Sequence, residues 1–274
     1  MTIDRRMLLG GMAGAAALSP FLALERAVAA VAQDGAAHAD LMAIPGMKMH
    51  GDEKVAMLLY PGFTVLDLVG PHYFFACMMG ATVHLVTTGT PHAAVPSDLG
   101  LAIQPTATLD SVPRNLDLLF VPGGTTGTIA AMDDKRITGW LADRGARAKL
   151  VTSVCTGSML LGKAGLLKGK RATSHWVTRP LLTRVGATPV DARVVTDCSV
   201  VTGAGVSAGL DFALAIVARL RGAPYAQALM LQAEYHPEPP LAGGTLATTP
   251  PPIATAMDDM FAAVREGFAK AARG

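Results

Sequence analysis

The sequence predicts an α/β protein: a single three-layer domain with a mostly parallel sheet and helices on both faces. Short, nearly continuous apolar runs, such as 55–60 (VAMLLY) and 116–121 (LDLLFV), alternate with segments of helical periodicity. Nearly continuous apolar runs are typical of strands that are buried on both faces of a sheet. In addition, Cys155 stands where a third run, 149–154, changes to Thr-Gly-Ser and a helical pattern. Strands that alternate with helices indicate a parallel sheet.

Each element is expected from its local pattern. The strands are expected, in chain order, at 55–60, 82–87, 116–121, 149–154, 171–174, 193–196 and 199–202, with a hairpin-like stretch at 93–103. The helices are expected at 66–79, 133–147, 156–163, 177–185, 206–221, 224–234 and 253–272. Gly and Pro residues separate these segments, as turn and helix-end signals do.

Composition excludes several classes of function. The chain has 274 residues, of which 51% are hydrophobic and 16% charged, which fits one globular domain with additional segments. The formal net charge is +2 without a basic block, so no nucleic-acid partner is predicted. No His/Cys cluster has metal-ligand spacing, and no Gly-rich loop precedes a lysine. We therefore expect neither a metal nor another cofactor.

The chain is expected to divide into four segments. Residues 1–32 predict a signal peptide of the twin-arginine type, because Arg5-Arg6 precede a weakly apolar run and an A-x-A spacing. A retained membrane anchor is the alternative, and the glycines and proline in that run disfavour it. We expect a periplasmic protein without a stable anchor. A linker at 33–53, the domain at 54–235 and a proline-rich segment with a terminal helix at 236–274 follow.

Cys155 is the candidate nucleophile. A cysteine on a sharp strand-to-helix turn is exposed and strained, and the helix N-terminus after it favours a thiolate. The backbone amides of Thr156 and Gly124 are candidates for an anion-stabilising pair, with Gly123 beside them at the end of another strand. The alternative is that Cys155 is a buried small hydrophobe, as free cysteines usually are.

Asp67 is the second candidate. It lies among apolar residues in the segment VLDLVGPH, shortly after the first strand. Burial disfavours the charged form of a carboxyl group, so Asp67 could hold a proton near neutral pH and act as an acid or a base. An equally good interpretation from these residues alone is an N-cap for the helix that follows.

Several of these motifs together resemble the DJ-1/PfpI superfamily, and within it the isocyanide hydratase branch. They are LDLVGPH, VPGG, VTSVCTGSMLLGKAGLLKGKRATSHW, the pair VVTD/VVTGAGVSAGLDFAL, and LQAEY. The resemblance implies a flavodoxin-like domain, also described as class I glutamine amidotransferase-like, and a homodimer. It also implies a cofactor-free hydro-lyase that converts a small isocyanide into a formamide. The nucleophile of the family maps to Cys155, its carboxylate to Asp67, and its neighbouring hydroxyl to Thr156.

The sequence departs from much of this superfamily at two positions. Thr156 stands where many members have His, and Asp67 where many have Glu, which disfavours protease or amidotransferase chemistry. Alternatives remain open: a glyoxalase-like enzyme acting on reactive carbonyls, or a periplasmic ligand or thiol-redox sensor without turnover. A transcription regulator is disfavoured because only about forty residues follow the domain. His175 is the remaining candidate base and is expected to be a structural histidine at a strand end. We expect His72 on a helix surface or a pocket wall, Cys77 in the core, and Cys198 exposed in a tight turn.

Overall fold

The computed structural model describes residues 40–273, and Gly46–Gly274 form one compact unit. Its centre is a seven-stranded sheet in the order β10-β11-β7-β6-β1-β2-β5. Neighbouring strands are parallel except for β10 and β11, which are antiparallel. The strands are β1 (Lys54–Leu59), β2 (Thr82–Thr87), β5 (Ala107–Thr108), β6 (Leu118–Val121), β7 (Leu150–Val154), β10 (Val194–Asp197) and β11 (Val200–Gly203). The predicted α/β class with a mostly parallel sheet is confirmed.

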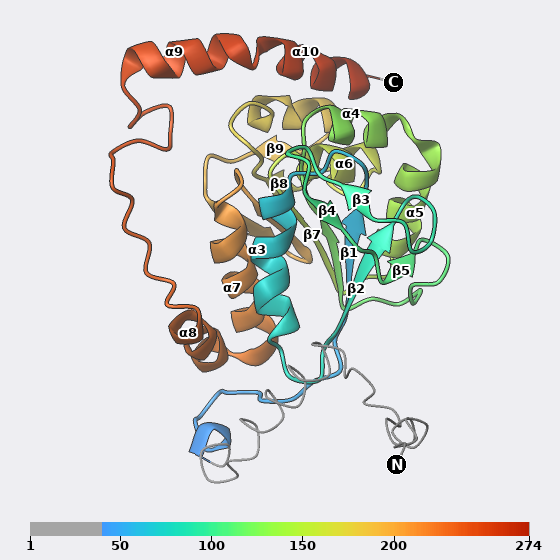
Figure 1. The fold of residues 1–274 in the computed structure, drawn as a ribbon, viewed down its shortest axis with the longest axis vertical. Coiled ribbons are helices and arrows are strands. Elements are labelled where there is room, and N and C mark those ends of the chain that lie inside the picture. Colours follow the sequence, from blue (N-terminus) through green and yellow to red (C-terminus); the bar gives the residue numbers. More distant parts are fainter. Residues whose placement is uncertain (1–39, 274) are drawn as a thin grey trace, which may run out of the picture. The chain divides into compact units, whose positions relative to one another are not determined.

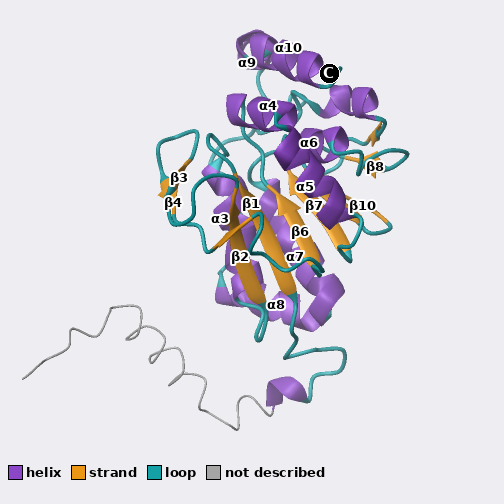
Figure 2. Ribbon diagram, turned by 90° about the vertical axis from the view of Figure 1, so that its right-hand side faces the viewer, coloured by secondary structure: helices purple, strands orange, loops and turns teal. Residues whose placement is uncertain are grey.

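Helices cover both faces of this sheet, as Figures 1 and 2 show. One layer contains α3 (Val65–Ala76), α7 (Ala208–Arg221) and α8 (Ala223–Gln232). The other contains α4 (Thr126–Asp133), α5 (Lys135–Gly145) and α6 (Gly157–Lys163). Helices on both faces explain why the inner strands are nearly continuous apolar runs: Val55 to Leu59 of β1 have no solvent exposure.

An aromatic cluster holds α3 against the sheet. The Phe75 ring of α3 lies 6.4 Å from Phe120 of β6 and 6.5 Å from Phe212 of α7, between ring centroids. Phe120 and Phe212 are 5.7 Å apart, and all three side chains are fully buried. Such edge-to-face and tilted contacts stabilise beyond the burial of area alone. The cluster therefore sets the position of α3, whose first turn carries Asp67.

The segments outside the main sheet partly match the expectations. The hairpin-like stretch is the antiparallel pair β3 (Val95–Pro96) and β4 (Ala102–Ile103), and β8 (Arg171–Ala172) pairs in parallel with β9 (Thr188–Pro189). The stretch expected as a helix at 177–185 is the 3-10 helix η1 (Arg179–Val185), which has a proline in its first turn. The sequence patterns did not predict α4, β5 or β9.

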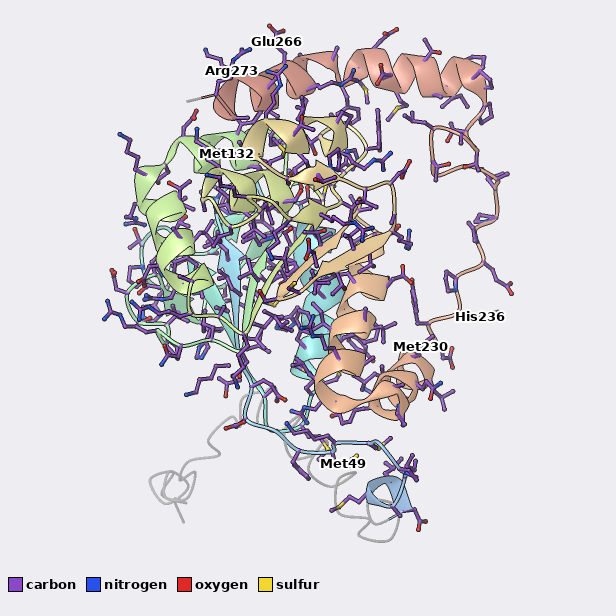
Figure 3. The ribbon with its side chains drawn as sticks, turned by 180° about the vertical axis from the view of Figure 1, so that it is seen from behind. Met49, Met132, Met230, His236, Glu266 and Arg273 are labelled. Atoms are coloured by element: carbon purple, nitrogen blue, oxygen red, sulfur yellow. The ribbon has the colours of Figure 1, made fainter. Side chains whose placement is uncertain are left out.

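The terminal helix expected at 253–272 is two helices, α9 (Pro251–Met260) and α10 (Ala262–Ala271). The chain leaves helical geometry at Phe261, whose φ is −88° and ψ 1°. α10 packs on α4 and buries Phe268, whereas α9 has no buried residue. Figure 3 shows His236 at the start of the extended segment that leads from α8 to α9.

Part of the expected linker belongs to the folded unit. The backbone amide of Lys48 donates to Arg221 O at 2.9 Å, and that of Gly51 donates to Met79 O at 3.1 Å. Glu53 is buried against the fully buried Arg221. The expected leader, residues 1–32, lies outside the described residues. No helix of the described part of the chain combines the length and the apolar character that a membrane span requires.

Candidate active site

Cys155 occupies a strained turn between β7 and α6. Its φ is +58°, in the left-handed region that a side chain other than glycine rarely adopts. The backbone amide of Cys155 donates to the carbonyls of Gly203 and Ala204, at 3.1 and 2.7 Å. A Cβ at Gly157 would collide with the carbonyl oxygens of Val121 and Pro122, so the turn needs glycine there. This is the geometry of the nucleophile elbow expected from the sequence.

Two serine hydroxyls hold the carbonyl of the elbow. Ser158 Oγ and Ser174 Oγ donate to Cys155 O at 3.1 and 3.0 Å, and Ser174 also bonds Thr178 Oγ1 at 2.7 Å. All three side chains are fully buried. Hydrogen bonds at a strained position stabilise a backbone conformation that would otherwise relax. Ser174 lies 19 residues from Cys155, and no local sequence signal identified it.

Asp67 lies in the first turn of α3 and has no solvent exposure. The amide of Gly123 donates to its Oδ2 at 2.8 Å, and Oδ1 has no hydrogen-bond partner among the described residues. The Cys155 thiol interacts with the carboxyl group and lowers its pKa. The N-cap interpretation is wrong, because the N-cap residue is Thr64 and Asp67 lies inside the helix.

Burial raises the pKa of Asp67 to about 7. The Gly123 hydrogen bond and the Cys155 thiol act in the opposite direction, and the charge of Asp98 adds to the increase. At neutral pH the group can therefore both release and accept a proton, as a general acid or base must. This agrees with the behaviour expected of a carboxyl group in an apolar setting.

The Cys155 thiol does not behave as the sequence led us to expect. Burial raises its pKa well above the ordinary value, the charge of Asp67 adds to this, and the amides of Thr156 and Val206 oppose it. The expectation of a thiolate favoured by the helix N-terminus is wrong, because desolvation and Asp67 outweigh the amides. The sulfur is a thiol that needs a base, and Asp67 is the carboxyl group beside it.

The Thr156 hydroxyl joins two loops. It donates to Gly124 O at 2.6 Å, accepts from the Gly124 amide at 2.9 Å, and lies 3.2 Å from Thr128 Oγ1. These are the partners of the hydroxyl among the described residues, so it makes no hydrogen bond to Asp67 or to the Cys155 sulfur. The Gly124 amide is already bonded, so the expected Thr156–Gly124 anion-stabilising pair is wrong. The amides that face the sulfur belong to Thr156 and Val206, and the sequence patterns did not identify Val206.

Gly123 is required by the close approach of three groups. A Cβ at this position would lie 2.7 Å from Asp67 Oδ2, from Thr156 N and from Thr156 Oγ1. Its amide is bonded to Asp67, so Gly123 orients the carboxyl group and has no amide left for a substrate anion. The candidate residues Cys155, Asp67, Thr156, Gly123 and Gly124 therefore lie together, with different contacts from those expected for both glycines.

A cavity of about 670 Å³ lies beside this site. Leu66, which precedes Asp67, and the stretch 204–208, which includes Val206, form its inner wall. Cys155 and Asp67 are not among the residues that line the cavity, and only 5% of Cys155 is exposed, so the expectation of an exposed cysteine is wrong. His175 and Trp176 form another side of the cavity. Burial lowers the pKa of His175 to about 4, helped by the charge of Arg179, so the ring is neutral at physiological pH.

The remaining candidates lie away from the sulfur. His72 and Cys77 are half-buried at α3, and Cys77 bonds Gln232 Nε2 at 3.5 Å. Cys198 is exposed in the β10–β11 turn. A second cavity, of about 440 Å³, lies near the ends of β2 and β5 and shares no residue with the site. Within the described residues, no group of three or more His, Cys, Asp or Glu side chains is arranged to hold a metal ion.

Comparisons with known proteins agree with this geometry. The DJ-1/PfpI family model matches residues 53–219. An isonitrile hydratase of Pseudomonas putida is 44% identical over 197 residues, which cover 72% of this chain and 85% of that protein. A crystal structure of a THiJ/PfpI family protein from Pseudomonas syringae is 51% identical, with a TM-score of 0.81, and covers 82% of this chain and 93% of that one. A deglycase of Thermococcus kodakarensis is 31% identical over 147 residues, 53% of this chain and 85% of that protein.

The chain belongs to the DJ-1/PfpI family. The resemblance seen in the sequence motifs is thereby confirmed, and so is the likeness to an isonitrile hydratase. The elbow cysteine and the buried carboxyl group both lie inside the matched residues.

Proposed function

We propose that this protein is a cofactor-free hydratase that adds water to an isocyanide and releases an N-substituted formamide. The observation that carries the proposal is the pairing of the Cys155 thiol with the fully buried Asp67 carboxyl group, whose pKa is about 7. The 44% identity to an isonitrile hydratase supports the same reaction. In this proposal Cys155 and Asp67 are the catalytic residues.

The first half of the reaction consumes the isocyanide. The Asp67 carboxylate accepts the Cys155 proton while the sulfur attacks the terminal carbon of R–N≡C. The same proton then passes from Asp67 to that carbon, which gives the thioimidate R–N=CH–S–Cys155. The carboxyl group thus supplies the base that a thiol of raised pKa needs. The amides of Thr156 and Val206 stabilise the sulfur while it carries negative charge.

The second half releases the product. Asp67, again a carboxylate, removes a proton from water as the oxygen adds to the thioimidate carbon, and the same proton then passes from Asp67 to the nitrogen. The tetrahedral R–NH–CH(OH)–S–Cys155 then expels the sulfur, and its hydroxyl proton passes to the sulfur by way of Asp67. The product is R–NH–CHO, so the net change is one water added to one isocyanide. The hydrogen bonds between Thr156 and Gly124 hold the Cys155 turn and the loop of Gly123 in place during both steps.

Formamide formation from an aryl isocyanide tests the proposal. Wild-type protein should give turnover, Cys155→Ala should give none above background, and Asp67→Asn should lose about 100- to 10,000-fold in rate. Mass spectrometry of Asp67→Asn mixed with substrate should show whether a Cys155 adduct accumulates. Folded wild-type protein without turnover, or full activity in Cys155→Ala, would refute the hydratase assignment.

One relative supports a second candidate function. The deglycase of Thermococcus kodakarensis is 31% identical over half of this chain, so the alternative is an enzyme that acts on reactive carbonyls. Cys155 would then attack a carbonyl carbon, with Asp67 moving the proton. Methylglyoxal turnover that exceeds isocyanide turnover, and that Cys155→Ser abolishes, would favour this candidate.

Assembly and location are part of the proposal. We expect a homodimer, because α3 presents the partly exposed apolar side chains of Val69 and Tyr73 outside the cavity. Sedimentation at several concentrations tests this expectation. We also expect twin-arginine export to the periplasm from the Arg5-Arg6 pattern. Cell fractionation of wild type and of the Arg5→Lys/Arg6→Lys variant tests it, and export that does not depend on the arginine pair would contradict it.

A further inference from the structure

The cavity beside Cys155 has an outer wall that comes from far along the chain. Leu66 and the stretch 204–208, which lie next to Asp67 and the Cys155 sulfur, line the cavity, and residues 244–247 line it as well. These four residues belong to the extended segment between α8 and α9, which Figure 1 shows in red-orange.

The segment has a defined shape at this point. Thr245 Oγ1 and Thr248 Oγ1 are 2.7 Å apart, Thr248 Oγ1 donates to Gly243 O at 2.8 Å, and the Thr249 amide donates to Thr245 O at 2.9 Å. These bonds form a compact turn, which we call the 243–249 turn. Leu246 is its largest apolar side chain and lines the cavity at 49% exposure. Leu241, in the same segment, is 82% exposed and does not line the cavity.

Aromatic groups complete the cavity on a third side. The rings of His175 and Trp176 are 5.5 Å apart, and Phe261, at the junction of α9 and α10, lies 6.0 Å from His175 and 5.7 Å from Trp176. Phe261 follows the 243–249 turn in the chain, so one C-terminal segment supplies the turn and supports the aromatic side. Flat, polarisable surfaces of this kind bind apolar or aryl groups.

The charges in the cavity are paired. Arg179 Nη1 lies 2.8 Å from Asp191 Oδ1, and Arg193 forms an ion pair with Asp211, which also accepts from Tyr235 OH at 3.0 Å. Each charged side chain that lines the cavity therefore has a partner of opposite charge. The cavity suits an uncharged group.

We propose that the 243–249 turn is the outer wall of the substrate pocket and that Leu246, which lines the cavity together with Trp176, selects isocyanides by the size of their uncharged organic group. The isocyano group is narrow and linear, so it reaches past Leu66 and Val206 to the sulfur while the organic group stays in the cavity. The substrate class that follows is a neutral aryl or bulky alkyl isocyanide. This inference rests on the proposed hydratase function for its chemistry but not for the wall itself.

Alkylation of Cys155 by reagents of two sizes tests the wall without any turnover. Full-length wild type, Leu246→Ala, Leu246→Trp and the control Leu241→Ala would each react with iodoacetamide and with a bulky N-aryl iodoacetamide. Peptide mass spectrometry would follow Cys155 separately from Cys77 and Cys198. Relative to iodoacetamide, Leu246→Ala should favour the bulky reagent by about tenfold, Leu246→Trp should disfavour it, and Leu241→Ala should match wild type.

The same variants test the substrate class by kinetics. The ratio of kcat/KM for an aryl isocyanide to that for a small alkyl isocyanide should change in the same order as the alkylation ratio. If both Leu246 variants match Leu241→Ala in the alkylation ratio, the turn is not the wall and the inference fails. If the alkylation ratio changes but no variant hydrates an isocyanide, the wall stands and the proposed function fails.

Discussion

The amide of Gly123 donates to Asp67 Oδ2 at 2.8 Å across 56 residues of sequence. This bond fixes the carboxyl group so that its other oxygen, which has no hydrogen-bond partner among the described residues, is left for the Cys155 thiol and a substrate. The bond also moderates the effect of burial on the carboxyl pKa. The loop after β6 thereby sets the orientation and the acidity of a group on α3.

Replacing Gly123 should therefore damage the site selectively. In Gly123→Ala the new Cβ would lie 2.7 Å from Asp67 Oδ2 and from Thr156 N, so the carboxyl group has to move. Because misplacement by about 1 Å can cost about a hundredfold in rate, we expect a loss of that order in kcat/KM. Gly139→Ala is the matched control: it is exposed in α5 with open space at its Cβ, so activity should stay and stability should rise by about 0.5–1 kcal/mol. Equal effects in both variants would contradict the prediction.

The pH profile of kcat/KM should report Asp67. With its pKa at about 7, the carboxylate form that accepts the Cys155 proton becomes populated as the pH rises through 7. We expect kcat/KM to increase with pH, to reach half of its maximum near pH 7, and to level off above that pH until the next group titrates. Initial rates in overlapping buffers between pH 5 and 9 measure this. A profile that is flat across this range would exclude Asp67 as the base.

The buried Asp67 carboxyl group should also lower the free energy of unfolding as the pH rises toward neutrality. Its folded pKa is raised above the ordinary value of 3.8, so the folded state binds the proton more tightly than the unfolded state. The resulting stability is fully present below the unfolded pKa and is lost as the pH rises through about 7. Asp67→Asn should therefore raise the free energy of unfolding at pH 8, by at most about 4 kcal/mol, and by much less near pH 4. Urea denaturation at both pH values measures the difference, and an equal gain at both would contradict it.

The Thr156 hydroxyl should matter more for structure than for proton transfer. Thr156→Val removes the bonds to the amide and the carbonyl of Gly124, both buried, and should destabilise by about 1–3 kcal/mol. Thr156→Ser keeps the hydroxyl and should lose little. Both variants should retain the pH midpoint of kcat/KM near 7, because the hydroxyl does not contact Asp67. A shifted midpoint in Thr156→Val alone would show that the hydroxyl acts on the carboxyl group after all.

The buried ion pair of Glu53 and Arg221 should anchor the start of the domain. Arg221 has no exposure and also donates to Met49 O and Met79 O, at 2.8 and 3.0 Å. Glu53→Gln leaves this guanidinium without its counter-charge and should cost about 3–5 kcal/mol of unfolding free energy. Arg147→Ala, which removes an exposed ion pair with Asp143, should change stability little. Comparable losses in both would contradict a special role for the buried pair.

The same pair predicts how stability responds to acid. Burial by itself raises the pKa of Glu53, but the hydrogen bond from Arg221, a backbone hydrogen bond and the charges of Arg221 and Lys48 outweigh it, so the net pKa is lowered. A lowered folded pKa contributes stability that is present above the unfolded pKa of 4.5 and is lost as the pH falls through the folded pKa. Wild type should lose this contribution in acid, whereas Glu53→Gln should not.

Local patterns predicted the elements well where one segment carried its own signal. The apolar runs of β1, β6 and β7, the turn at Cys155 and the helix after it follow from residue types within a few positions. The patterns failed where pairing with another segment determines the structure. β5 and β9 are two-residue strands that exist only through their pairing with β2 and β8. Likewise, residues 46–53 lacked a period and were predicted to be a linker, but Arg221 and Met79 hold them on the domain.

The sequence by itself determined the α/β class, the elbow at Cys155 and the apolar setting of Asp67, because short-range chemistry specifies all three. Only the tertiary structure decided that the Gly123 and Gly124 amides are already bonded, that Val206 faces the sulfur, and that the thiol pKa is raised. The physical reason is that hydrogen-bond partners and desolvation depend on groups distant in the chain. Gly123 is 56 residues from Asp67, and Glu53 is 168 from Arg221. These residues come into contact only when the sheet and both helix layers have packed.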